Sequence, residues 1–121
     1  MPKVASYTVV RDTDLTLPDN EDIDSDEFEF GAPNLTTSTA GADRPILSFK
    51  VNPLADDARV VVILNDVQRF AQTYSDGPIR TITEVLSHGE VLASGNTLVV
   101  KREGTGTFVI SDIVISYKAD V

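Results

Sequence analysis

The sequence predicts an all-β fold, specifically a single antiparallel β-sandwich of jelly-roll type. Apolar residues recur with period two, or in short runs that are apolar on both faces, as in half-buried and fully buried strands. Gly-containing turn sequences separate these runs at roughly the 8 to 12 residue spacing of a sandwich or barrel. A chain of 121 residues without Cys is long enough to bury a core without disulfides. We therefore expect one domain over residues 1–121.

The N-terminal part is expected to contribute two short strands, "SYTVV" at 6–10 and "EFEF" at 27–30. In the second strand two Phe form an apolar face and two Glu a charged face, which also discourages aggregation between exposed sheet edges. The acidic segment 12–30 is otherwise expected to be exposed and loosely held. The stretch 32–45 is rich in Thr, Ala, Gly and Pro, and is expected to be an irregular loop.

The clearest strand is "ILSFKV" at 46–51, which places Leu47, Phe49 and Val51 on one face. The next run, "RVVVIL" at 59–64, is β-branched and apolar on both faces. This composition is typical of a central strand that is covered on two sides.

Asn65 and Asp66 follow this run and both tolerate left-handed backbone, so they predict a hairpin turn into a strand that starts "VQRF". A helix over 66–74 is the competing interpretation, because the apolar residues of that stretch are also at helical spacing. We prefer the hairpin because the preceding strand ends in a turn pair.

The remaining strands are expected at 79–86, 96–100 and 107–117. In the last of these, the apolar residues before Ser111 share one parity and those after Asp112 share the other. Either a β-bulge near Ser111-Asp112 keeps one core face continuous, or the strand is buried on both faces.

The net charge of −9 is concentrated at the N-terminus. Residues 1–30 hold nine acids and two bases, whereas residues 31–121 hold ten acids and eight bases. This balance repels phosphate backbones, and no basic cluster with interleaved aromatics overrides it, so we expect no nucleic-acid partner. No secretory signal or apolar stretch of about 20 residues is visible, so we expect no membrane partner and a cytoplasmic or particle-borne protein.

The single His, His88, is the one residue that favours a Ser-His-Asp hydrolase. Against this, the chain has no Gly-x-Ser-x-Gly elbow, and His88 stands beside Gly89 in an expected surface turn. We interpret His88 as a solvated turn residue and expect no enzyme activity.

The acidic stretch 19–30 is the best candidate for a metal site. Asp22, Asp24 and Asp26 alternate like the first ligands of an EF-hand, but Glu27 stands where that loop needs Gly and Pro33 where it needs Glu. A looser Ca²⁺ site would draw on Asp19, Glu21, Asp22, Asp24 and Asp26. A solvated loop is the preferred interpretation, so we expect no cofactor and keep Ca²⁺ as the alternative.

The segment from about residue 45 to residue 118 resembles the jelly-roll β-sandwich accessory domains of the galactose-binding-like type. The residues that carry the resemblance are Leu64, Asn65, Gly95, Asn96, Leu98 and Val100. The chain departs from those domains in having Asp66 where Gly is usual and in lacking Trp, and no set of sugar-contacting residues carries over. The resemblance implies binding or assembly rather than catalysis.

We therefore expect a non-enzymatic structural or interaction module, a subunit or decoration protein of a larger assembly such as a virus or phage particle. Protein partners or self-assembly follow from that interpretation, since polar loops such as 32–45 suit partner contacts. The alternative is a carbohydrate-binding module, with or without Ca²⁺.

Overall fold

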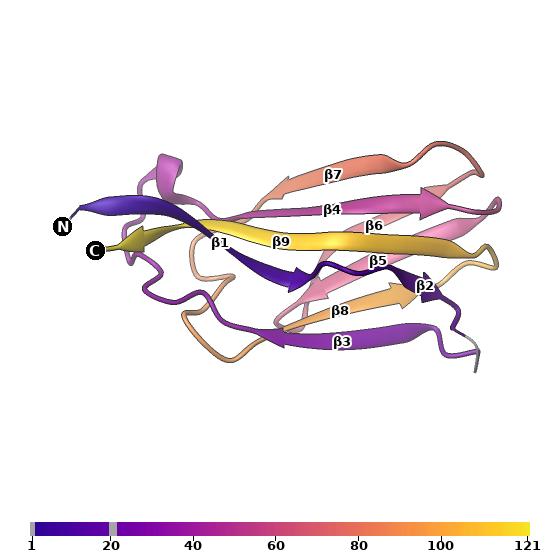
Figure 1. Cartoon of the computed structure of the whole chain (residues 1–121), viewed down its shortest axis with the longest axis horizontal. Helices are drawn as coiled ribbons and strands as arrows, with labels where there is room; N and C mark the ends of the chain where they lie inside the picture. The colour runs from indigo at the N-terminus through magenta and orange to yellow at the C-terminus, as the bar shows by residue number, and fades with distance from the viewer. Residues whose placement is uncertain (1, 20–21) are drawn as a thin grey trace.

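The computed structural model describes residues 2–19 and 22–121, over which the chain forms two antiparallel sheets packed face to face (Figure 1). Sheet A has the order β1-β9-β4-β7, with β2 also paired to β9, and sheet B has the order β3-β8-β5-β6. The strands are β1 Lys3–Arg11, β2 Leu15–Leu17, β3 Ser25–Phe30, β4 Ile46–Pro53, β5 Ala58–Leu64, β6 Val67–Tyr74, β7 Arg80–Val85, β8 Asn96–Arg102 and β9 Phe108–Asp120. The predicted all-β sandwich is confirmed. Within the described residues, no helix has the length and apolarity to cross a membrane.

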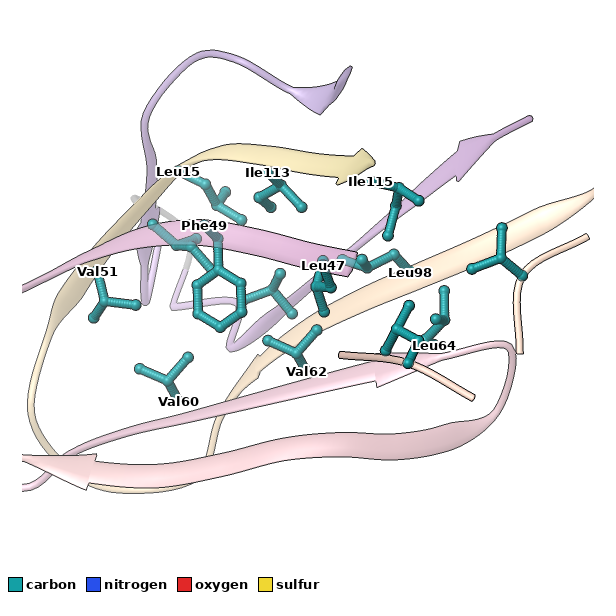
Figure 2. Packing of buried hydrophobic residues seen from close by; sticks show 14 of the residues in the cluster. Leu15, Leu47, Phe49, Val51, Val60, Val62, Leu64, Leu98, Ile113 and Ile115 are labelled. Carbon is teal, nitrogen blue, oxygen red and sulfur yellow. The ribbon is translucent and has the colours of Figure 1, made fainter. Parts of the chain in front are cut away.

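The core lies between β4 and β5, the strands with the clearest patterns in the sequence. Leu47, Phe49 and Val51 share the inner face of β4 and are buried, as predicted. Figure 2 shows these side chains pointing toward the buried Val and Leu side chains of β5. The Phe49 ring also meets the Phe70 ring edge to face, with centroids 5.2 Å apart. β5 lies between β8 and β6, so the prediction of a central strand is confirmed. On its outer face Val61 is buried but Arg59 and Ile63 are only half-buried, so that face is partly covered.

The hairpin prediction after β5 is confirmed. Asn65 and Asp66 have positive φ angles of 48° and 66°, which suit the tight turn that matches strand twist. The following residues form β6, which pairs antiparallel with β5. The helix over 66–74 is therefore wrong, because pairing with β5 overrides its helical spacing.

Of the two interpretations of the last strand, the β-bulge is correct. The register of β4 with β9 jumps from Ser48↔Val114 to Lys50↔Ser111, so Phe49 faces two residues of β9. Asp112 takes a left-handed φ of 52° at this point. The bulge brings the apolar residues on both sides of it onto one buried face: Phe108, Ile110, Ile113, Ile115 and Tyr117.

The acidic segment is held more firmly than the sequence suggests. Its apolar Leu15 and Leu17 form β2, a strand missed in the sequence because it spans three residues between Asp14 and Pro18. The predicted strand at 27–30 is confirmed as part of β3, whose full length pairs with β8. Its two Phe side chains pack against the core, as expected. Two parts of the acidic segment are therefore fixed in sheets, β2 by pairing with β9 and β3 by pairing with β8.

Candidate functional site

Two loops enclose a hollow of about 470 Å³. Both loops lie at the end of the sandwich that carries both chain termini (Figure 1). The walls of the hollow are loop 32–45, which precedes β4, and loop 86–95, which joins β7 to β8. We call it the loop-end hollow, and its lining residues are Leu35, Thr36, Thr37, Ser38, Thr39, Asp43, Pro45, His88, Gly89, Val91, Leu92 and Ala93. Its volume lies within the roughly 300 to 1,000 Å³ of small-ligand sites.

The first wall is irregular, as predicted, apart from a 3₁₀ turn over Gly41–Asp43. Its start is fixed by the end of β9. The Thr36 N–H donates to the carbonyl of Lys118 at 2.9 Å. The hydroxyl of Tyr117, which lies on the core face as expected, donates to the carbonyl of Pro33 at 3.1 Å. The residues just after Thr36 therefore start from a rigid support.

Asp43 holds the rest of this wall in place. Its carboxylate is 6% exposed, and its Oδ2 accepts hydrogen bonds from Lys3 Nζ and Ser38 Oγ, each at 2.6 Å. The hydrogen bond from Lys3, and then that from Ser38, lowers the pKa of Asp43, so the group is ionised at neutral pH. Its charge is compensated by Lys3, which makes it a structural anchor.

The second wall is held by a buried amide. Asn96 is fully buried at the start of β8; its Oδ1 accepts from Leu92 N at 2.7 Å and from Asn65 Nδ2 at 3.0 Å. Its Nδ2 donates to the carbonyls of Leu92 at 2.7 Å and Phe30 at 3.2 Å. Asn65 Nδ2 also donates to the carbonyl of Glu90 at 2.8 Å. Asn65 and Asn96, which carry the resemblance, therefore hold loop 86–95 in place through hydrogen bonds to its backbone.

His88 lies in a turn, as predicted, but the expectation that its side chain is solvated is wrong. The ring is half-buried and lines the loop-end hollow. Its Nε2 is covered from water and has no hydrogen-bond partner among the described residues. No Ser–His dyad is therefore formed at Nε2 in this part of the chain. His88 therefore contributes a partly buried ring to the lining.

The described Ca²⁺ candidates lie at the opposite end of the sandwich, and three of them are engaged in other contacts. Asp24 forms an ion pair with Arg102 of β8 at 2.9 Å. The carboxylates of Asp19 and Asp26 accept backbone N–H bonds from nearby residues. Asp22 occupies a turn with φ 59°, and Glu21 lies outside the described residues. Across residues 2–19 and 22–121, no three His, Cys, Asp or Glu side chains are placed to hold a metal ion.

The loop-end hollow suits a neutral, hydroxyl-rich ligand. Ser and Thr hydroxyls both donate and accept hydrogen bonds, as sugar hydroxyls do. Apolar side chains from both loops supply contact area, and no Lys or Arg is among the lining residues that the structure describes. The sequence showed neither wall, because no local pattern indicates that residues 50 apart meet around a cavity.

No protein-family model and no curated protein sequence matches the chain. Among solved structures, it is similar to a part of dimeric latent PorU from Porphyromonas gingivalis, with a TM-score of 0.70 and 12% identity over 99% of this chain and 13% of that one. It is also similar to the CBM36-1 domain of a multidomain xylanase from the hindgut metagenome of Trinervitermes trinervoides, with a TM-score of 0.54 and 13% identity over 99% of this chain and 100% of that one. A third similar structure is CBM29_1, a family 29 carbohydrate-binding module from Piromyces equi, with a TM-score of 0.50 and 10% identity over 93% of this chain and 91% of that one.

These likenesses confirm the jelly-roll β-sandwich fold that the resemblance to galactose-binding-like accessory domains implied. At such low identity they show the fold alone. The chain spans about an eighth of the PorU chain, whereas it spans nearly the whole of the two carbohydrate-binding modules.

Proposed function

We propose that the chain is a carbohydrate-binding module that holds a neutral glycan in the loop-end hollow. The observation that carries the proposal is the lining of this hollow: the exposed Thr37 and Thr39 with their hydroxyls, the half-buried ring of His88, and apolar side chains. The similarity in fold to two carbohydrate-binding modules supports it. A particle subunit, which the sequence alone favours, has weaker support than a carbohydrate-binding module.

The site predicts weak binding that is selective for neutral polymers. No Phe, Tyr or Trp ring lines the hollow within the described residues, so sugar rings lack a large stacking platform. Affinity then depends on a few hydrogen bonds of about 1 kcal/mol each, and dissociation constants near 1 mM are expected. Acidic polymers are disfavoured by the net charge of −9.

Affinity electrophoresis tests this proposal. We expect xylan, mannan or hydroxyethyl cellulose to retard the native protein and polygalacturonate not to do so. His88→Ala and Thr37→Val each remove one hydrogen-bonding group and are expected to weaken retention about three- to tenfold.

Two matched controls are expected to behave like the native protein. Ser87→Ala changes an exposed neighbour of His88 outside the lining, and Thr13→Val makes the same exchange as Thr37→Val at an exposed position in the β1–β2 connection. The proposal would be contradicted if no neutral polymer retarded the native protein. It would also be contradicted if the His88→Ala and Thr37→Val variants were retarded as strongly as the native protein.

Calcium is not expected to take part. Because Asp24 is paired with Arg102 and the other described acids of this segment do not converge, about 5 mM Ca²⁺ should leave the melting temperature unchanged relative to chelator. This concentration lies above the dissociation constants of about 0.1 to 1 mM of extracellular sites. A rise of more than about 2 °C in differential scanning calorimetry would restore the Ca²⁺ hypothesis for this segment.

A structural subunit is the second candidate function. The observation that favours it is the outer face of β1, where Tyr7 is 68% exposed and Val9 47% exposed. Large exposed apolar side chains often mark protein contacts. If the protein is a particle component, it should sediment with a large particle from its source, and Tyr7→Ala should release it. If the protein from its source sediments only as a free monomer of 13.1 kDa, this candidate is contradicted.

A further inference from the structure

Strand β7 is an open edge of sheet A, because β4 is its single strand neighbour among the described residues. The Leu86 N–H donates to the Pro45 carbonyl on the β4 side at 2.8 Å, and backbone groups alternate in direction along a strand. Arg80, Ile82 and Glu84 therefore direct their N–H and C=O groups at β4. Thr81 and Thr83 direct theirs outward, where no strand of the described residues pairs with them. The outward carbonyl of Val85, at the end of this edge, accepts a hydrogen bond from Arg69 Nη2 at 3.1 Å.

The sequence along this edge is self-complementary. The edge sequence is "IRTITEV", residues 79–85. If a second copy pairs with it antiparallel and centred on Ile82, residues at equal distances on either side of Ile82 face each other. The opposed pairs are then Ile79 with Val85, Arg80 with Glu84, and Thr81 with Thr83. Apolar pairs, opposite charges and Thr–Thr pairs are all favourable cross-strand contacts.

The directions of the backbone N–H and C=O groups also fit a two-fold axis at Ile82. With Ile82 on the two-fold axis, Thr81 of one copy lies opposite Thr83 of the other, and both direct their backbone groups at the partner. Such opposed residues exchange two hydrogen bonds, so the two Thr pairs supply four. A shift of the axis to Thr83 would place Glu84 opposite Ile82 and lose the charge pairing.

The two charged side chains at this edge have no oppositely charged partner among the described residues. Arg80 and Glu84 form no ion pair with any described residue, although the Arg80 guanidinium lies 5.0 Å from the Tyr74 ring centre. Ile79 and Val85 are 63% and 46% exposed. In the antiparallel pair each charge meets its opposite, and each apolar side chain covers the other.

Long-range charge does not oppose this contact. The acid excess of residues 1–30 belongs to the part of the chain that forms β1, β2 and β3. In sheet A, β1 is the edge strand opposite β7, and Figure 1 shows β3 and β7 on opposite margins of the molecule. The stretch 67–85 carries two bases and two acids. The β3 edge has the exposed acids that discourage pairing, whereas β7 has no Pro, Lys or register shift along its described ladder.

We propose that the chain forms a two-fold symmetric dimer through antiparallel pairing of β7 with β7 of a second copy. The contact joins the two A sheets into one continuous sheet. A single six-residue edge is a small interface, so the dimer is a weak one, with a dissociation constant of about 10 µM to 1 mM. It also directs the two loop-end hollows in opposite directions, so that one dimer presents two separate sites.

Sedimentation velocity over a concentration series in about 0.15 M salt tests the dimer. The native protein should shift from monomer to dimer as its concentration rises. Arg80→Glu places Glu opposite Glu84, and Glu84→Arg places Arg opposite Arg80, so each should weaken association at least tenfold. The double variant R80E/E84R exchanges the two charges and should dimerise like the native protein.

A backbone variant provides an independent check. Thr83→Pro removes an N–H that faces the open edge, so the monomer should keep its fold while dimerisation is lost. Melting temperatures establish that each variant is folded. A native protein that stays monomeric to 1 mM, the upper end of the weak range, overturns the proposal. Single charge variants that dimerise like the native protein, or a folded double variant that fails to dimerise, overturn it as well.

Discussion

Replacing Phe49 with Ala is expected to lower the free energy of unfolding by about 3–5 kcal/mol. Phe49 is among the largest fully buried side chains, and it stands at the middle of β4, opposite the bulge in β9. Its removal leaves a cavity that two sheets cannot close, and it also deletes the edge-to-face contact with Phe70. For a domain whose total stability is about 5–15 kcal/mol, this is a large fraction. Urea denaturation followed by circular dichroism measures the loss.

Two variants calibrate this result. Phe49→Leu keeps most of the volume and should cost less than half as much as Phe49→Ala. Phe70→Ala should also cost less, because Phe70 is only partly buried on the edge strand β6. If Phe49→Ala lost less than about 1 kcal/mol with an unchanged denaturant slope, the packing of the two sheets around β4 would be wrong.

Replacing Asn96 with Ala is expected to lower stability by about 3 kcal/mol and to abolish glycan binding at the loop-end hollow. The variant leaves the N–H and carbonyl of Leu92 and the carbonyl of Phe30 without their amide partner at a partly buried site. Loop 86–95 then loses its support, and its amides should exchange hydrogen faster. Denaturation, hydrogen exchange and affinity electrophoresis on the same variant measure the three effects.

Asn65→Gly is the matched comparison, because Gly tolerates the left-handed φ of this turn position. It removes the donor to Asn96 and to the Glu90 carbonyl and the acceptor of the Thr97 N–H, while leaving the Leu92 bonds intact. It should cost less stability than Asn96→Ala. In the double variant the two losses should not add, since the residues share a hydrogen bond. Additive losses, or an Asn96→Ala protein that binds glycans normally, would show that this network does not shape the site.

Features with a local chemical cause were predictable from the sequence. The Asn65-Asp66 turn follows from residues that tolerate left-handed backbone, and the bulge at Asp112 follows from a change of parity within one strand. The alternating face of β4 identified the core directly. In each case the cause lies within a few residues, so one sequence is enough to see it.

Features made by distant pairing were not predictable. Leu15–Leu17 became a strand because β9 offered a free partner, and Leu35 bridges Ala119 across more than 80 residues. His88 lines the same hollow as residues of loop 32–45. Nothing in the sequence around His88 indicates that this distant loop lies next to it. The buried role of Asn96 had a signal in the resemblance, but its hydrogen-bond partners had none.

The measurement that tests the central claim most directly is an NMR titration of the ¹⁵N-labelled native protein with neutral xylo- and cello-oligosaccharides. The claim is that the loop-end hollow binds a neutral glycan. It predicts saturable shift changes confined to the amides of residues 36–39 and 88–92, and their loss in His88→Ala. Shift changes centred instead on the exposed sheet faces around Tyr7, or no changes up to about 10 mM ligand, would contradict it.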